Sequence, residues 1–333
     1  MAGQFVPRLP ASTPPPHRAS HLNRDRSSPR EHVECPAAST VIRLVENATL
    51  RDHAIVSRKL ELIREEKLFR LLPGRTKHSR LEASGVALVD HNTALVVFDN
   101  LNQVARSDLS LKRQASNALL PPPSLGSGFE DVGIDQRYRR VFCLVESVED
   151  CDGRLRGFVA EYDQDGRFIR CSRLPARLAK ANKGFEGLEH VWRGSREYLY
   201  ALCEAAPKLG KGRIEVFVRA RNSEWKASHR IQLPKKAEFE DYAAMSYRAR
   251  KLAVVSQASA RVWVAEIDEK ARAVVSGSQA VYRFPSKRYG NVEGIAWLAP
   301  DTLVAVSDRT KKQQPDRCSD KDQSIHLFRI PAG

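Results

Sequence analysis

A short acidic motif recurs five times along this chain, at steps of about fifty residues. In each copy a glutamate opens an apolar run, and the five glutamates are Glu82, Glu130, Glu186, Glu240 and Glu293. A second apolar run follows in each copy and ends at a polar residue, which is Asp99, Glu146, Glu204, Gln257 or Asp308. Self-similarity at this period predicts a repeat architecture, and four short strands per repeat are typical of a propeller blade.

The second repeat shows most clearly how four strands fit into one unit. Residues 132–135, 141–145, 155–162 and 168–174 are strand-like. The second of these runs is wholly apolar, as expected of a strand that is buried on both faces. We therefore predict an all-β fold, a β-propeller of five four-stranded blades. Six blades are the alternative, if residues 41–80 form a degenerate blade.

The last repeat is one strand short. It offers residues 292–297, 303–307 and 325–330, after which the sequence ends at Gly333. A closed ring leaves no strand edge unpaired. We therefore expect the missing strand to come from the N-terminal side, within residues 41–63, and to close the ring.

Residues 1–40 differ from the rest in composition. They are rich in Pro, Ser and Arg, with no acidic residue before Asp25. We predict a disordered basic tail over residues 1–40 and a single β-propeller domain over residues 41–333. An organellar transit peptide is an alternative, although the prolines disfavour the amphipathic helix that such a peptide forms. An over-extended start of translation is another.

The chain carries a net charge of +15, which is spread along the sequence and not gathered in one arm. Such a surface favours an anionic partner, a small molecule or an acidic protein, without predicting specific nucleic-acid binding. No apolar stretch approaches the ~18 residues of a membrane span. The six cysteines include no Cys-x-x-Cys pair, and without an apolar signal segment a reducing compartment is the default. We expect a cytoplasmic monomer.

The geometry of a propeller turns the repeated acid into a site hypothesis. The first strand of each blade lies nearest the axis, and antiparallel pairing places its start beside the end of the second strand. The acidic residues that open the first strands and end the second strands should therefore converge at one end of the channel. Carboxylates that lie so close need raised pKa values, basic partners or a bound cation.

Oxygen-only ligands favour Ca²⁺ or Mg²⁺ over zinc or copper. The predicted metal ligands are Glu82, Glu130, Glu186, Glu240 and Glu293. A structural role is the alternative, in which each glutamate accepts backbone N–H bonds from the neighbouring blade. Ion pairs with basic residues just upstream are a third interpretation, and the residues concerned are Arg80, Lys183, Lys235, Lys236 and Arg288.

Long loops after the second strands should emerge at the same end of the channel. The loop 309–323 is the most basic of them and would suit an anionic substrate. The residues predicted to bind substrate are Asp308, Arg309, Glu204, Glu146 and His190. His190 follows Glu186 by four residues, which predicts the same side of the strand and a role as general base. A satisfied inner-strand histidine is the alternative.

The segments Glu293-Gly294-Ile295-Ala296-Trp297 and Phe185-Glu186-Gly187-Leu188-Glu189 resemble those of several related propeller families. These are the esterase-like phytase domains, the SdiA-regulated propellers and, more distantly, the gluconolactonase/regucalcin group. The similarity covers roughly residues 80–330. In the gluconolactonase group the Glu of a similar motif is a metal ligand, so the resemblance implies that role for Glu293. The Asn and Asp ligands of that group have no clear counterpart here.

These observations lead to two functional hypotheses. The first is a metal-binding propeller with hydrolase activity on a phosphate ester or a lactone, in which a Glu-bound cation polarises the substrate or activates water. The second is a non-enzymatic scaffold that presents its basic surface to a partner. No nucleophile elbow, His-Glu-x-x-His motif, P-loop or dinucleotide fingerprint occurs in the sequence.

Overall fold

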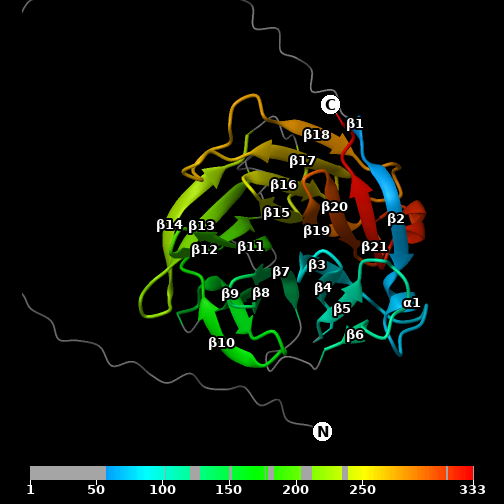
Figure 1. Ribbon diagram of the computed structural model, residues 1–333, viewed down its shortest axis with the longest axis horizontal. Coiled ribbons are helices and arrows are strands. Elements are labelled where there is room, and N and C mark those ends of the chain that lie inside the picture. The colour runs from blue at the N-terminus through cyan, green and yellow to red at the C-terminus, as the bar shows by residue number, and fades with distance from the viewer. Residues whose placement is uncertain are drawn as a thin grey trace, which may run out of the picture. The chain divides into compact units, whose positions relative to one another are not determined.

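Five β-sheets are arranged around a common axis in this computed structural model (Figure 1). It describes residues 58–101, 103–120, 128–149 (side chains of 146–149 excepted), 152–176, 178, 184–203, 212–234, 239–312 and 314–332. Four of the sheets have four antiparallel strands, and the fifth has one further strand at its edge. The first strands of every two neighbouring blades contact each other. The five-bladed propeller is therefore confirmed. The predicted tail over residues 1–40 and the domain start at residue 41 lie outside the described residues.

The first three blades follow the chain in order. Blade 1 contains β3 (Ala83–Leu88), β4 (Thr93–Phe98), β5 (Ala105–Asp108) and β6 (Ala118–Leu119). Blade 2 contains β7 (Phe129–Asp135), β8 (Arg140–Glu149), β9 (Leu155–Tyr162) and β10 (Phe168–Arg173). Blade 3 contains β11 (Phe185–Arg193), β12 (Arg196–Cys203), β13 (Arg213–Arg219) and β14 (Trp225–Gln232).

The last two blades each include a strand from the N-terminal side. Blade 4 contains β15 (Ala244–Arg248), β16 (Lys251–Ser256), β17 (Arg261–Glu266) and β18 (Ala280–Arg283), with β1 (Arg58–Lys59) added in parallel to β18. Blade 5 contains β19 (Val292–Ala299), β20 (Thr302–Ser307), β21 (Ser324–Arg329) and β2 (Glu61–Lys67).

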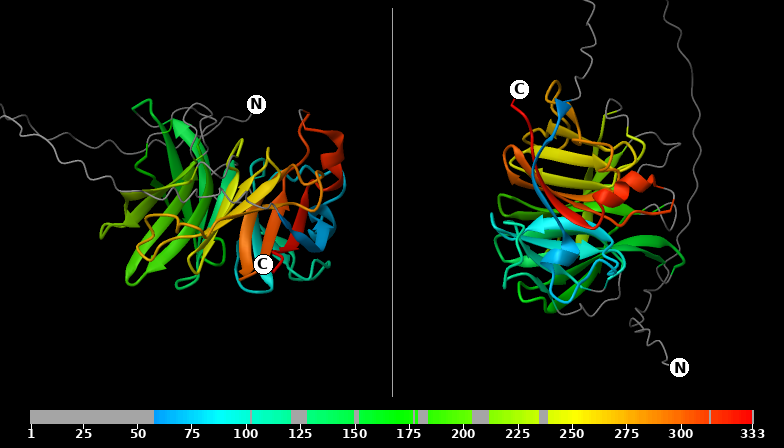
Figure 2. Two further views of the ribbon diagram at one scale, coloured as in Figure 1. Left: turned by 90° about the horizontal axis from the view of Figure 1, so that it is seen from above. Right: turned by 90° about the vertical axis from the view of Figure 1, so that its right-hand side faces the viewer.

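The predicted ring closure is observed, with the closing strand slightly further along than expected. β2 pairs antiparallel with β21 at the outer edge of blade 5, and Figure 2 shows the two strands side by side. The strand extends past the expected segment 41–63 to Lys67, after which α1 (Leu68–Leu71) leads towards blade 1. A 3₁₀-helix, η2 (Asp316–Asp320), lies in the loop before β21.

Every buried apolar cluster fills the interface between two neighbouring blades, which explains why the second strands read as unbroken apolar runs. In β4, Ala94, Val96 and Phe98 pack towards blade 5, whereas Leu95 and Val97 pack towards blade 2. Alternate side chains of a strand point to opposite faces, so a blade that is covered on both sides needs apolar residues at every position.

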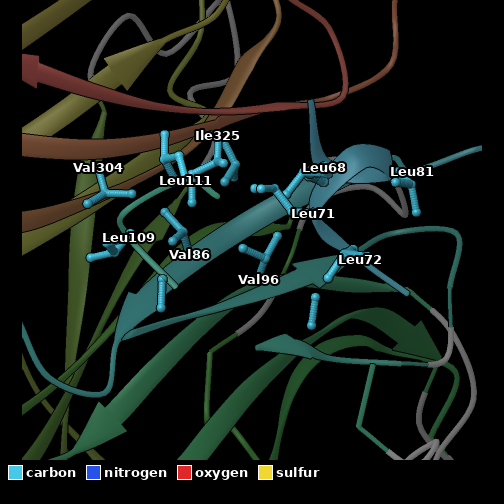
Figure 3. Packing of buried hydrophobic residues seen from close by; sticks show 14 of the residues in the cluster. Leu68, Leu71, Leu72, Leu81, Val86, Val96, Leu109, Leu111, Val304 and Ile325 are labelled. Carbon is cyan, nitrogen blue, oxygen red and sulfur yellow. The ribbon is translucent and has the colours of Figure 1, made fainter. Parts of the chain in front are cut away.

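The cluster between blades 5 and 1 also receives the helix that follows the closing strand. Leu68, Leu71 and Leu72 pack there with Val304 and Ile325 (Figure 3). None of the three leucines is more than 1% exposed. Burial of each such side chain stabilises the fold by about 1.5–3 kcal/mol. The N-terminal segment thus joins the closing blade to the first one.

The first strands approach so closely at the axis that Gly187 and Gly294 leave no room for a larger side chain. A Cβ atom on Gly294 would lie 2.9 Å from Cα of Gly85, in the neighbouring blade. A Cβ on Gly187 would lie 2.9 Å from the backbone nitrogen of Met245. The register places Gly85, Asp131, Gly187, Ala244 and Gly294 at equivalent positions of the five blades.

Among the described residues, no helix combines the length and the apolarity that a membrane crossing requires.

The Gly294→Ala variant should lower the free energy of unfolding by about 1–3 kcal/mol, because the new methyl group would overlap Gly85 and Val306. The exposed Ala227→Ser change should alter it by less than about 0.5 kcal/mol. Urea unfolding followed by circular dichroism measures both. Equal stabilities of wild type and Gly294→Ala would contradict the tight axial packing.

Candidate functional site

A cavity of about 220 Å³ lies where the first strands begin. A β-bulge in β7, β11 and β19 occurs at the same place in each strand, and the residue within it is Glu130, Glu186 or Glu293. All three glutamates line the cavity. The predicted convergence of acidic side chains at one end of the channel is therefore observed for these three blades.

Two of the five predicted glutamates do not occupy this position. In blade 1 the bulge residue is Ser84, and in blade 4 the register places Ala243 there; both line the cavity. Glu82 lies two residues before Ser84, where it pairs with Arg80, as the third interpretation of the motif expects. Glu240 lies three residues before Ala243 and is exposed. Glu82 and Glu240 thus belong to the sequence motif, but the strand pairing places other residues at the position of the three remaining glutamates.

The sequence contained a signal for the correct register. Gly85 aligns with Gly187 and Gly294, and this alignment brings Ser84, not Glu82, under the glutamates. In blade 4 the second strand Leu-Ala-Val-Val-Ser aligns with Leu-Val-Ala-Val-Ser of blade 5. Counting back from these strands leads to Ala243.

Lys311, from the basic loop 309–323, forms ion pairs with two acidic residues at this end of the channel. Its Nζ lies 3.2 Å from Oε1 of Glu293 and 3.0 Å from Oδ2 of Asp308, and the amide of Gln257 also donates to Glu293. Although burial alone lowers it, the two carboxylates raise the pKa of Lys311, so the ammonium stays charged. Lys311 therefore neutralises part of the acidic cluster.

The remaining acids at this end are not fully compensated. Burial and the charge of Asp308 raise the pKa of Glu293 to about 8. Burial and the charges of Asp308 and Glu82 raise the pKa of Asp99 to about 7. Burial also raises the pKa of Asp308. Near neutral pH this cluster thus holds protons that a cation could replace.

The other predicted substrate-binding residues are placed less completely. Asp308 is buried, and Arg309 is half-exposed with its guanidinium 3.9 Å from Glu82. Glu204 and the side chain of Glu146 lie outside the described residues. Asp241, which the sequence analysis did not single out, lines the cavity and accepts a hydrogen bond of 2.5 Å from Ser256.

Two acidic residues close to the motif accept hydrogen bonds from the neighbouring blade. This is the structural role that was the alternative prediction for the five glutamates. Asp131 accepts the backbone N–H of Leu188 at 2.7 Å, from blade 2 to blade 3. Glu189 accepts the N–H of Tyr247 at 2.9 Å and the hydroxyl of Ser246 at 2.8 Å, from blade 3 to blade 4. Burial raises the pKa of Asp131, and raises that of Glu189 to about 7.

His190 does not line the acidic cavity. The bulge at Glu186 shifts the alternation of β11, so the four-residue spacing does not place both side chains together. His190 lies instead in a buried network, where Nε2 is 3.1 Å from Glu197 and Nδ1 is 3.9 Å from Asp135. Its ring stacks on Phe142 with centroids 4.8 Å apart.

Asp135, His190 and Glu197 offer three potential ligand atoms within 4.8 Å of one another. A cation already lies among them, because the Arg140 guanidinium is 2.7 Å from Asp135 and 2.8 Å from Glu197. Burial alone raises the pKa of Glu197, but hydrogen bonds from His190 and Arg219 lower it to about 2. The guanidinium supplies the positive charge that a metal would otherwise supply.

A second constellation has the hydrogen-bond order of a Ser–His–acid triad. Ser307 Oγ is 2.8 Å from His326 Nε2, and His326 Nδ1 is 3.1 Å from Oε2 of Glu65. Ser307 and His326 are both fully buried, so no substrate reaches the hydroxyl. Glu65 also binds Lys321 and accepts the hydroxyl of Tyr289 at 2.9 Å. These contacts fasten the closing strand β2 to blade 5.

No protein-family model and no curated protein matches the sequence. Among solved structures, Myxococcus xanthus glutaminyl cyclase is similar over 84% of this chain and 100% of its own, with 12% identity and a TM-score of 0.52. The PQQ-bound aldose sugar dehydrogenase from Streptomyces coelicolor is similar over 80% of this chain and 98% of its own, with 12% identity and a TM-score of 0.45. The WD40 repeats of RRP9 are similar over 82% of this chain and 100% of their own, with 8% identity and a TM-score of 0.45.

Five sheets of at least four strands around one axis make the chain a five-bladed β-propeller. At 12% identity, the likeness to the glutaminyl cyclase is a likeness of fold alone. The resemblance of the Glu-Gly segments to the phytase-like and gluconolactonase families stays a prediction.

The Arg140→Met variant should lower the free energy of unfolding by about 3–5 kcal/mol, since buried Asp135 loses its guanidinium partner, and Glu161 and Glu197 keep only Arg219 of the two guanidinium groups they share. The acids concerned are Asp135, Glu161 and Glu197. Arg139→Met, one residue away and exposed, is the matched control and should change little. Thermal and urea unfolding measure the stability of both variants. If Zn²⁺ stabilises the wild type and Arg140→Met leaves the free energy of unfolding unchanged, the guanidinium is not the resident cation.

The acidic end should make the protein less stable as the pH rises from about 5 to 8. Native Asp99 and Glu293 hold protons up to about pH 7 and 8, whereas unfolded carboxyls lose theirs near pH 4. The native state thus binds more protons, so the free energy of unfolding falls through this window and levels off above it. Glu293→Gln should flatten the slope in urea titrations. A stability that rises with pH in wild type would contradict these protonation states.

Proposed function

We propose that the acidic end of the channel binds a divalent cation, Ca²⁺ or Mg²⁺, and that the protein hydrolyses a small anionic substrate there, a phosphate ester or a lactone. The observation that carries this proposal is the convergence of Glu130, Glu186 and Glu293 on one cavity. These three carboxylates come from three different blades and line one cavity. A purely architectural role would favour the same residue in all five blades, whereas blades 1 and 4 have Ser84 and Ala243 at this position.

The donor set of the cavity fits a hard cation. The potential ligands on its wall are oxygen atoms: three Glu carboxylates, Asp99, Asp241, the Ser84 hydroxyl and the Gln257 amide. Ca²⁺ takes six to eight such oxygens, whereas zinc and copper favour nitrogen or sulfur. Lys311 occupies the side towards Asp308, so a cation would be held on the side of Glu130 and Glu186.

The bound cation would polarise the scissile group and lower the pKa of a water molecule. Lys311 and Arg309, which come from the loop beside the cavity, would attract and orient the anionic part of the substrate. Asp99 lines the same wall, and its pKa of about 7 allows it to exchange a proton with water near neutral pH.

Added Ca²⁺ or Mg²⁺ should raise the Tm of the purified protein, and more so at pH 8.5 than at pH 6.5, because protons then no longer compete. A free ion concentration 100 times the Kd would add about 2.7 kcal/mol to the free energy of unfolding. Glu130→Gln, Glu186→Gln and Glu293→Gln should each reduce the shift. Glu240→Gln is the matched control, since Glu240 belongs to the sequence motif but is exposed and outside the cavity wall.

The hydrolase part has a separate readout. Turnover of p-nitrophenyl phosphate or of a γ-lactone should depend on the ion and be lost in Glu293→Gln but not in Glu240→Gln. If elemental analysis finds no bound ion and no ion shifts the Tm, the cation site is refuted. An ion-dependent Tm without turnover of either substrate class would leave a structural cation and refute the hydrolase.

A further inference from the structure

The opposite end of the channel has a cavity of its own, of about 370 Å³. It shares no lining residue with the acidic cavity at the other end. Its volume lies within the range of small-molecule sites. The proposed hydrolase uses none of its residues.

One carboxyl group is built into the wall of this cavity. The equivalent positions of the five first strands are occupied by Ala87, Gly133, Glu189, Ser246 and Ala296, so the other four side chains are small. Small neighbours leave open space in front of Glu189. Its carboxyl is thus the one acidic group at this level of the described ring.

The carboxyl of Glu189 is oriented through one oxygen. Oε1 accepts two hydrogen bonds, from Ser246 Oγ at 2.8 Å and from the Tyr247 backbone N–H at 2.9 Å. The Ser246 hydroxyl in turn accepts the backbone N–H of Trp297 at 3.1 Å. No hydrogen bond to Oε2 is found within the described part of the chain, so the second oxygen remains available to a ligand.

Residues with aromatic or apolar side chains form the next layer of the wall; among them Tyr247 is half-buried and Trp297 is almost fully buried. The equivalent positions one residue further along the five strands are Leu88, Ile134, His190, Tyr247 and Trp297, and all of them line the cavity. Ammonium groups are attracted both to a carboxylate and to the faces of Trp and Tyr rings. The cation Arg248 lies at the exposed rim, where its guanidinium donates to the backbone carbonyls of Trp297 and Leu298.

We infer that this cavity binds a small organic ammonium compound, with the charged nitrogen at Glu189 and an apolar body against Tyr247. A metal ion fits less well, because one carboxylate in the wall and one at the exposed rim do not supply the several oxygens that a hard cation needs. An anion is disfavoured by the carboxylate itself. The exposed Asp90 at the rim adds a second negative charge that favours a cationic ligand.

Isothermal titration calorimetry at pH 8 with benzylamine as the probe tests the inference. Benzylamine should bind with a Kd of about 1 mM or tighter, and its neutral isostere benzyl alcohol at least about tenfold more weakly. Glu189→Gln, which keeps the shape and loses the charge, should weaken benzylamine binding at least about tenfold. Glu269→Gln is the matched control, since that side chain is 86% exposed on the surface.

The Glu130→Gln and Glu293→Gln variants should leave benzylamine binding unchanged, which separates this site from the proposed cation site. Equal binding of benzylamine and benzyl alcohol, undiminished binding by Glu189→Gln, or no binding up to about 10 mM would each overturn the inference. If Glu189→Gln does not fold, Tyr247→Leu decides. It keeps the carboxylate and removes an aromatic face, so weaker binding supports the inference and unchanged binding overturns it.

Discussion

The close approach of five first strands at the axis is the constraint on which the rest of the structure depends. With only five blades the strands meet at van der Waals distance, and Gly85 and Gly294 are in direct backbone contact range. At that level three of the five positions are glycine, and the Asp131 side chain is bonded to the next blade. Chemistry is confined to the two ends of the channel, and each end has its own cavity.

The same contact requires adjacent blades to be joined by specific bonds. Ser84 donates to the Phe129 carbonyl at 2.5 Å, while Asp131 and Glu189 accept backbone N–H groups from the blades that follow them. These bonds satisfy polar groups that the packing removes from water. Buried acids in this protein thus have two distinct roles. Some hold blades together, and others gather in a cavity where their charge is only partly balanced.

The fold could be predicted from the sequence because its determinants are local and repeated. A wholly apolar run such as residues 141–145 is typical of a strand that is covered on both faces, and its recurrence at a fixed period predicts the number of blades. Ring closure followed from the missing strand of the last repeat. The position of the candidate site at the start of the first strands followed from antiparallel pairing.

The individual site residues were harder to predict, because a β-bulge changes the register without changing the composition. Glu82 and Glu240 carry the right letter near the right place, yet Ser84 and Ala243 occupy the position. The same bulge moves His190 away from Glu186, into the network around Arg140. Pairings such as Lys311 with Glu293, or Ser307 with His326 and Glu65, depend on segments far apart in the chain and leave no local signal.

The closing strand has a consequence for the order in which the ring can form. Residues 61–67 leave the ribosome among the first of the propeller, but their partner β21 is made last. Until then the nascent chain carries an unsatisfied strand edge at each end of an open arc. Such edges pair readily with other chains. The ring of this chain can therefore close only after β21 has been made.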